Sequence, residues 1–307
     1  MRMSTLFSLL SAVSAVVGED YTATKLTQLQ NSNTWINNLL PRGDTGYILL
    51  AERWEGAVSM FDSFHQHGGP VSLGRVNQQQ SVGIVELSTN VYGVTGWSED
   101  GGETVPIVAM YKLNLTSPQP VLDNDDYDLQ APVSGLLKGA AAINPTISFQ
   151  ADIAGYLLRF NWVTGENGGV YPTPSGITPG ISGLGYREPY LYFSNTEEGT
   201  FNRVEVDQDG ELVGEVETLV ESPDLVGSGD FALSHWNEDA FVTNPELGTL
   251  LRIDLDEKTV SVVSAGTIPA PVAAKFAPWG GLLVAANVTE TEGSSIWSVA
   301  VPDEPTQ

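Results

Sequence analysis

Hydrophobic and polar residues alternate with a period of two along most of the chain, in short runs separated by Gly, Asn or Asp. The clearest case is a pattern that occurs twice. Residues 183–196 and 200–207 alternate on either side of a turn, and residues 231–244 and 249–256 repeat that arrangement. Alternation broken by turn residues is typical of consecutive antiparallel strands. The two copies therefore predict a protein built from repeated strand hairpins.

The repeat extends over nearly the whole chain. Equivalent second strands are spaced by 44, 57, 43, 49 and 42 residues, and they begin at Tyr47, Val91, Ser148, Leu191, Ala240 and Leu282. A third strand follows each, at 57–62, 106–111, 156–161 and 295–300 and at the runs that start at Thr200 and Thr249. A period of about 40 to 50 residues made of short strands indicates a β-propeller, and a β-sandwich would not need six evenly spaced hairpins. We predict an all-β, six-bladed propeller with four antiparallel strands per blade, closed into a ring by residues 22–29.

The first 18 residues have the pattern of a secretory signal peptide. A short basic start precedes an apolar run at 6–17, which is too brief to span a bilayer, and Gly18 precedes the charged Glu19. A buried strand or an uncleaved anchor is the alternative. We expect residues 19–307 to form one secreted propeller domain. The sequons at Asn114 and Asn287 are then candidate N-glycosylation sites.

Composition excludes several partners and chemistries. The chain has 38 acidic and 13 basic side chains and a formal net charge of -25, which disfavours binding to nucleic acid or to anionic membrane surfaces. It has no cysteine, so it has neither disulfides nor a thiol nucleophile. The acidic run at 123–128 lacks the glycine and the distal Glu of an EF-hand, and we expect it to be a solvated loop.

Familiar catalytic motifs are also missing. The chain contains no Gly-x-Ser-x-Gly, His-Glu-x-x-His or phosphate-loop pattern, and we expect its three histidines, His65, His67 and His235, to lie in turns or on the surface. General acid-base chemistry would fall to carboxylate, Tyr, Lys or Arg side chains.

Propellers bind ligands at one end of the central channel, where the innermost strands start. We predict these starts at 35–38, 80–83, 142–145, 180–183, 229–231 and 271–273. Three of them carry a polar residue at a matching place: Asn144, Ser182 and Asp230. A buried carboxylate is costly without a partner, so Asp230 either contacts a ligand or pairs with a cation such as Lys138, Arg187 or Lys275.

Residues 24–301 resemble the fungal secreted branch of the six-bladed, gluconolactonase-like propellers. The resemblance rests on Asn-Thr-Trp-Ile-Asn-Asn at 33–38, Gly-Ile-Ser-Gly at 180–183, Tyr-Leu-Tyr-Phe-Ser-Asn-Thr at 190–196 and Gly-Asp-Phe-Ala-Leu at 229–233. In the lactonase relatives, a Glu of the first blade, Asn residues of the middle blades and a later Asp hold a divalent metal. The corresponding positions here are Asn37, Asn144, Ser182 and Asp230, which keep one carboxylate, so we predict no metal site.

The same branch resembles the hetero-Diels-Alderases of fungal tropolone sesquiterpenoid biosynthesis, which need neither metal nor nucleophile, so we expect no cofactor. This resemblance implies a cycloaddition between a tropolone-derived ortho-quinone methide and an alkene of a humulene-type terpene, both small and largely apolar partners, to give a dihydropyran. We therefore assign provisional roles at the channel. Asn37 and Asn144 would hydrogen-bond the tropolone oxygens, Asp230 would act in the dehydration or orient a donor, and Ser182 would contribute to substrate binding.

Three further side chains are candidates for substrate binding. Trp35 and Trp54 would supply apolar walls, although large rings also fill the wedge between blades, the role we expect for Trp162, Trp236 and Trp297. Arg53 would donate to a developing oxyanion or form an exposed ion pair. A metal-dependent lactonase and a noncatalytic binding propeller remain alternatives to the cyclase.

Overall fold

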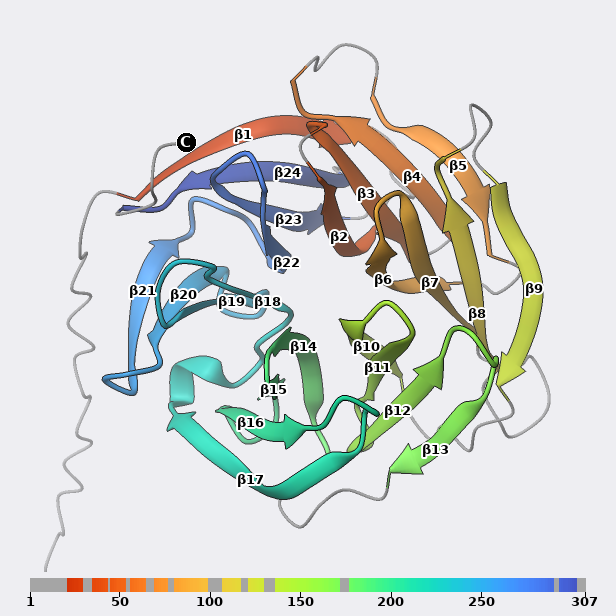
Figure 1. The fold of residues 1–307 in the computed structure, drawn as a ribbon. Helices are drawn as coiled ribbons and strands as arrows, with labels where there is room; N and C mark the ends of the chain where they lie inside the picture. The colour runs from red at the N-terminus through yellow and green to blue at the C-terminus, as the bar shows by residue number, and fades with distance from the viewer. Residues whose placement is uncertain are drawn as a thin grey trace, which may run out of the picture.

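The computed structural model describes residues 21–29, 35–43, 45–53, 56–64, 69–76, 80–98, 107–116, 121–129, 136–171, 177–289 and 293–302. Within them the chain forms β-strands and one short 3-10 helix, Pro223–Leu225. The strands make six sheets of four antiparallel strands each, arranged in a ring around a central channel (Figure 1). The six-bladed propeller predicted from the repeat is confirmed. The signal-peptide prediction lies outside the described residues.

The first five blades each run outward from the channel in chain order. Blade 1 contains β2 (Ile36–Arg42), β3 (Tyr47–Glu52), β4 (Ala57–Asp62) and β5 (Val71–Arg75). Blade 2 contains β6 (Gln80–Ser88), β7 (Val91–Ser98), β8 (Ile107–Asn114) and β9 (Val121–Leu129). Blade 3 contains β10 (Leu137–Asn144), β11 (Ile147–Asp152), β12 (Tyr156–Asn161) and β13 (Asn167–Tyr171). Blade 4 contains β14 (Ile181–Arg187), β15 (Tyr190–Asn195), β16 (Thr200–Val206) and β17 (Leu212–Glu221). Blade 5 contains β18 (Phe231–Leu233), β19 (Asp239–Asn244), β20 (Thr249–Asp254) and β21 (Thr259–Ala265).

The sixth blade joins the two ends of the chain. It contains β22 (Pro271–Phe276), β23 (Leu282–Thr289) and β24 (Gly293–Ala300), and its outermost strand is β1 (Thr22–Leu29). β1 pairs antiparallel with β24, from Thr22 opposite Ala300 to Leu29 opposite Ser294. The predicted closing strand is therefore confirmed. This pairing joins the two ends of the chain within one blade and closes the ring.

Large side chains fill the space between neighbouring blades. Trp162, 1% exposed, follows β12 of blade 3 and belongs to a hydrophobic cluster shared with blade 2. Its ring lies edge-on to Phe160 at 4.8 Å between centroids, and its Nε1 donates to Ser148 Oγ at 2.9 Å. A Cβ on Gly93 of β7 would lie 2.2 Å from this ring. The expected packing role of Trp162 is thus confirmed, and it requires a glycine in the facing strand.

The inner strands approach one another so closely that one position has no room for a side chain. A Cβ on Gly139 of β10 would lie 2.4 Å from the backbone nitrogen of Leu184 in β14. We expect Gly139→Ala to lower the free energy of unfolding by at least about 3 kcal/mol, because two backbones must separate. Gly43→Ala, with a φ of +44° and open space around it, should cost only about 1 to 2 kcal/mol. Chemical denaturation of both variants checks this, and equal losses would contradict the close contact.

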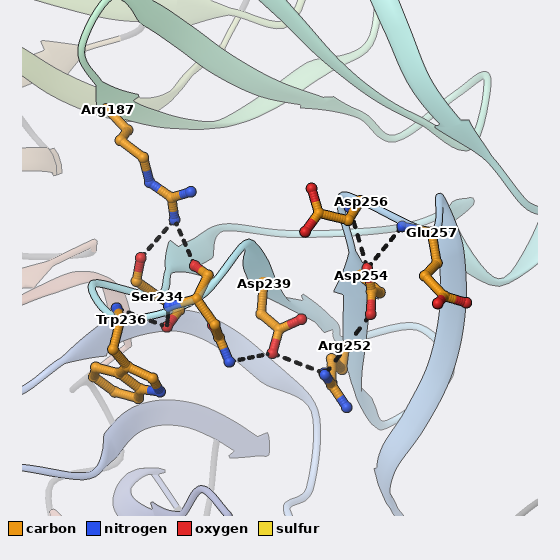
Figure 2. Close-up of polar contacts among 9 residues, drawn as sticks. Arg187, Ser234, Trp236, Asp239, Arg252, Asp254, Asp256 and Glu257 are labelled. Carbon is orange, nitrogen blue, oxygen red and sulfur yellow. Dashed lines mark hydrogen bonds and ion pairs between the residues drawn. The ribbon is translucent and has the colours of Figure 1, made fainter. Parts of the chain in front are cut away.

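A polar network links blades 4 and 5 at the ends of their inner strands (Figure 2). Arg187, the last residue of β14, donates to the backbone oxygens of Ser234 and Asn237. Buried Asp239 accepts hydrogen bonds from Asn237 Nδ2 at 2.7 Å and from Arg252 Nε at 2.9 Å. Arg187 is therefore engaged at the blade junction, and it is not the cation that pairs with Asp230.

The acidic run at 123–128 lies in strand β9, so the prediction of a solvated loop was wrong. β9 is the outermost strand of blade 2 and pairs only with β8, with Asp123 opposite Lys112 and Asp128 opposite Ala109. An outermost strand is held by main-chain hydrogen bonds along one edge and does not need the apolar alternation of an inner strand. Acidic composition therefore did not prevent strand formation.

Candidate functional site

The six inner strands β2, β6, β10, β14, β18 and β22 surround the channel (Figure 1). A cavity of about 330 Å³, called the upper cavity below, lies at the end where these strands begin. Each inner strand or the residue just before it contributes a side chain: Asn37, Val82, Lys138, Ser182, Asp230 and Val272. This is the end of the channel at which the sequence predicted a ligand site.

The structure brings five of the seven predicted channel residues to this cavity. They are Trp35, Asn37, Arg53, Ser182 and Asp230. Trp54 lies outside the described residues. Asn37 is half-buried and donates from Nδ2 to the backbone oxygen of Ser81 at 3.0 Å.

Asn144 does not belong to the site, contrary to the prediction. It is the last residue of β10, and its Oδ1 accepts hydrogen bonds from the backbone nitrogens of Thr146 and Ile147 at 2.8 and 2.9 Å. Its Nδ2 donates to the backbone oxygen of Gln208. Asn144 therefore stabilises the turn between β10 and β11 at the opposite end of the strand. The β10 side chain in the upper cavity is Lys138.

Asp230 immediately precedes β18 and is 6% exposed. Its Oδ2 lies 3.1 Å from Lys275 Nζ and accepts a hydrogen bond from Asn38 Nδ2 at 3.1 Å. Lys275 also donates to the backbone oxygen of Phe231 at 3.0 Å. Burial raises the pKa of Asp230, and the ammonium of Lys275 opposes this shift. Lys138, Arg187 and Lys275 were the possible partners from the sequence, and Lys275 is the one that pairs with Asp230. Asp230 also lines the upper cavity.

Four buried polar atoms of residues that line the cavity have no hydrogen-bond partner among the described residues. They are Asn38 Oδ1, Gln80 Oε1, Ser228 Oγ and Asp230 Oδ1. Buried polar groups in folded proteins are nearly always satisfied by protein, water or ligand. Their concentration at one end of the channel therefore indicates a site built to receive hydrogen bonds from a small molecule or from water.

Two cations lie on one side of the cavity. Lys138 is half-buried, and it has no ion pair or hydrogen bond within the described part of the chain. Burial and the nearby charge of Arg53 both lower its pKa. Arg53 follows β3, and its backbone nitrogen donates to Trp35 O at 2.7 Å. Sequence reasoning considered Lys138 only as a partner for Asp230, although a lysine inside the apolar run 136–143 was a signal for a functional cation.

The lactonase metal set is not assembled here. Of its four positions, Asn37, Ser182 and Asp230 line the upper cavity, whereas Asn144 lies at the other end of β10. The one carboxylate, Asp230, is paired with Lys275. Across the described ranges, no three His, Cys, Asp or Glu residues are grouped so that they could hold a metal ion. These residues do not fit the divalent cation of the lactonase relatives.

Comparison with known proteins identifies the fold and no family. No protein-family model matches the chain, and no curated protein matches its sequence. A luciferin-regenerating enzyme superposes with a TM-score of 0.69 at 10% identity, over 92% of this chain and 96% of that one. An aldose sugar dehydrogenase from Streptomyces coelicolor, in its PQQ-bound form, gives 0.60 at 14% identity over 92% and 98%. A virginiamycin B lyase from Staphylococcus aureus gives 0.57 at 9% identity over 92% and 100%. At these identities the likeness shows a shared propeller fold.

A second cavity of about 320 Å³, called the lower cavity below, lies at the other end of the channel. Its walls are mostly apolar and include Leu184 and Phe276. His235 lines it and is exposed, which agrees with its expected place at the surface. Lys275 lines the lower cavity whereas Asp230 lines the upper one, so their ion pair lies between the two.

The two sequons have different environments. Asn114 and Thr116 are exposed, and Asn114 Oδ1 accepts hydrogen bonds from the backbone nitrogen and hydroxyl of Thr116 at 2.9 and 2.6 Å. Asn287 is 2% exposed; its Nδ2 donates to Ile36 O, and its Oδ1 accepts from Ile36 N. A glycan on Nδ2 of Asn287 does not fit this fold, because that atom is buried and donates to Ile36 O, so Asn114 is the remaining candidate sequon.

We expect one glycan, at Asn114, when the chain is expressed through a eukaryotic secretory pathway. Asn114→Gln should remove the glycosidase-sensitive mass and leave the folded protein unchanged, because the side chain is exposed. Asn287→Gln should leave the glycan in place and reduce the yield of folded protein, since it breaks both bonds to Ile36. Intact-mass spectrometry of both variants checks this. A glycopeptide containing Asn287 in the folded protein would contradict it.

The described residues contain no helix that is long and apolar enough to cross a membrane.

Proposed function

We propose that the upper cavity catalyses a hetero-Diels-Alder cyclisation, joining a tropolone-derived ortho-quinone methide to an alkene of a humulene-type sesquiterpene. The observation that carries the proposal is a cavity whose lining combines apolar side chains with several unsatisfied buried polar atoms, and in which the described residues do not assemble a metal set. The resemblance of residues 24–301 to such cyclases supports the proposal. The enzymes named among the structural relatives support a catalytic propeller in general.

The proposed reaction has two steps. A tropolone that carries a neighbouring hydroxymethyl group loses water: its ring hydroxyl gives up a proton, and the hydroxymethyl oxygen leaves after accepting one. The resulting quinone methide then adds across an alkene. One C–C and one C–O bond form, and no atom is lost.

Asp230 is placed to assist the first step. Its carboxyl group is buried at the cavity wall, and burial raises its pKa against the opposing effect of the Lys275 ammonium, so it takes up a proton more readily than a solvent-exposed carboxylate does. Asn38 and Lys275 contact Oδ2, whereas Oδ1 accepts no hydrogen bond from a described side chain. We assign Asp230 as the donor to the departing hydroxyl group.

The second step needs positioning more than chemistry. Trp35, Val82 and Leu136 supply apolar surface for the terpene, and Asn37 keeps one amide N–H for a ring oxygen beyond its bond to Ser81. Holding two reactants in a near-attack pose can remove up to about 7 to 11 kcal/mol from a barrier. A hydrogen bond to the quinone oxygen would add electrostatic stabilisation.

The test is to incubate the purified protein with a tropolone methanol and humulenol, with and without EDTA, beside a panel of sugar lactones. We expect dihydropyran adduct above the buffer rate, unchanged by EDTA, and no lactone cleavage. If the protein cleaves lactones in an EDTA-sensitive way and forms no adduct, it is a metal-dependent lactonase and the cyclase proposal is wrong. Tight retention of either substrate without any turnover would favour a binding propeller.

A further inference from the structure

Lys138 has no role in the reaction as written above, yet it occupies a prominent place in the upper cavity. It is the second residue of β10, within a strand whose other side chains are apolar or small. Lys138 is half-buried, and it has no carboxylate partner among the described residues. A buried, unpaired ammonium is unfavourable unless something else supplies the compensating negative charge.

The other charged groups around the upper cavity do not neutralise Lys138. Arg53 adds a second cation close enough to lower the pKa of Lys138. Among the described residues that line the cavity, the acidic groups are Asp230, which is paired with Lys275, and exposed Glu246, whose carboxylate lies beside Gly227. Lys138 and Arg53 thus place two cations near each other at one end of the channel, in a chain that has 38 acidic and 13 basic side chains.

We propose that the upper cavity binds its ligand as a small organic oxyanion, with Lys138 as the counter-ion and Arg53 beside it. The apolar side chains of Trp35, Val82 and Leu136 line the same space, which favours a flat organic anion over a hydrated inorganic one. A deprotonated tropolone or another ring enolate has this combination of delocalised negative charge and apolar ring. The inference names the ligand class of the site in the proposed function, and it requires no turnover.

Binding the anion also bears on the dehydration step. Once the ring oxygen carries the negative charge, electrons can move from it toward the hydroxymethyl carbon as the hydroxyl group leaves. The proton for that hydroxyl comes from Asp230, so protons and charge balance without a further base. Lys138 would then hold the ligand in its reactive ionisation state, whereas Asp230 acts on the leaving group.

The experiment is calorimetric titration of the full-length protein at a pH where tropolone is ionised, with tropolone and its neutral O-methyl ether as probes. We expect the wild type to bind tropolone at least about 10-fold more tightly than the ether, because a charge-assisted contact contributes about 1.4 kcal/mol or more. Lys138→Met should remove this preference, and Lys138→Arg should keep most of it. Lys25→Met, which removes an exposed cation on β1, should bind both probes like the wild type.

Several results would overturn the inference. One is equal affinity of the wild type for the two probes, which needs no variant and so is independent of folding. Another is an unchanged preference in Lys138→Met with native circular dichroism, and a third is Lys138-dependent binding of inorganic phosphate without binding of tropolone. Lys138-dependent tropolone binding in a protein that forms no adduct would leave the inference standing and remove the proposed function. Full adduct formation by Lys138→Met would overturn the inference about Lys138 and leave the proposed function standing.

Discussion

Replacing Lys275 by methionine is expected to lower the free energy of unfolding by about 3 to 5 kcal/mol, one of the two largest effects that we predict. The substitution leaves Asp230 6% exposed with only Asn38 as its side-chain partner. It also removes the donor to Phe231 O. Urea denaturation of the wild type and of Lys275→Met at neutral pH measures the loss. Lys258→Met, in which an exposed pair with Glu217 is broken, should change stability by less than about 1 kcal/mol.

The loss in Lys275→Met should shrink at acid pH. The folded-state pKa of Asp230 is raised by burial, so its contribution to stability is fully present below its unfolded pKa and is lost as pH rises through the folded one. Without the Lys275 ammonium the folded pKa rises further, and the variant loses stability more steeply with pH than the wild type. A difference that stayed constant from acid to neutral pH would show that the ion pair does not cause the loss.

Asp230→Asn is expected to slow adduct formation from the tropolone methanol by about 100-fold or more, within the range reported for loss of a general acid. The amide cannot donate an acidic proton to the leaving hydroxyl group. A quinone methide released from a precursor that needs no enzyme should still be converted with the wild-type preference for one stereoisomer. The measurement is therefore the rate from each of the two precursors, by liquid chromatography.

Asp230→Asn also leaves Lys275 without its carboxylate partner, so a control must separate a loss of stability from a loss of catalysis. The double variant Asp230→Asn, Lys275→Met removes both charges and should recover much of the stability lost in the single variants, since a whole buried pair is often replaceable at little cost. It should remain slow with the tropolone methanol. Recovery of activity together with stability would show that Asp230 is structural and takes no part in the chemistry.

The fold was predictable because propeller strands follow a local pattern. The second strands, such as Tyr47–Glu52 and Tyr190–Asn195, are short apolar runs bounded by turns, and their spacing of 42 to 57 residues gives the number of blades. Closure by Thr22–Leu29 followed from counting: five blades were complete and the sixth lacked one strand. Neither step required knowledge of long-range contacts.

The candidate site was predictable only where an inner strand begins at a clear boundary. Asn37, Ser182 and Asp230 were found because Gly or Trp marks the start of their strands. In blade 3 the run Gly-Ala-Ala-Ala at 139–142 hides the alternation, and the Asn144-Pro145 turn resembles a strand start. The predicted position fell at the wrong end of β10, and Lys138 was missed as a site residue.

The partner of Asp230 could not be selected from the sequence. Lys138, Arg187 and Lys275 all lie near the channel, and the choice depends on how β10, β14 and β22 are rotated about it. Arg187 is held by the backbone of blade 5, Lys138 faces the cavity beside Arg53, and Lys275 reaches Asp230. Such discrimination depends on the three-dimensional arrangement of the inner strands, which alternation along the chain does not specify.

The central claim is that the upper cavity directs a cycloaddition, and the stereoisomer distribution of the adduct tests it most directly. Tropolone methanol and humulenol would be combined with and without the protein, with tropolone as an unreactive competitor in a third sample, and the products separated by chiral chromatography. The account predicts one dominant stereoisomer with the protein and the buffer distribution once tropolone fills the cavity. The buffer distribution in all three samples would contradict it.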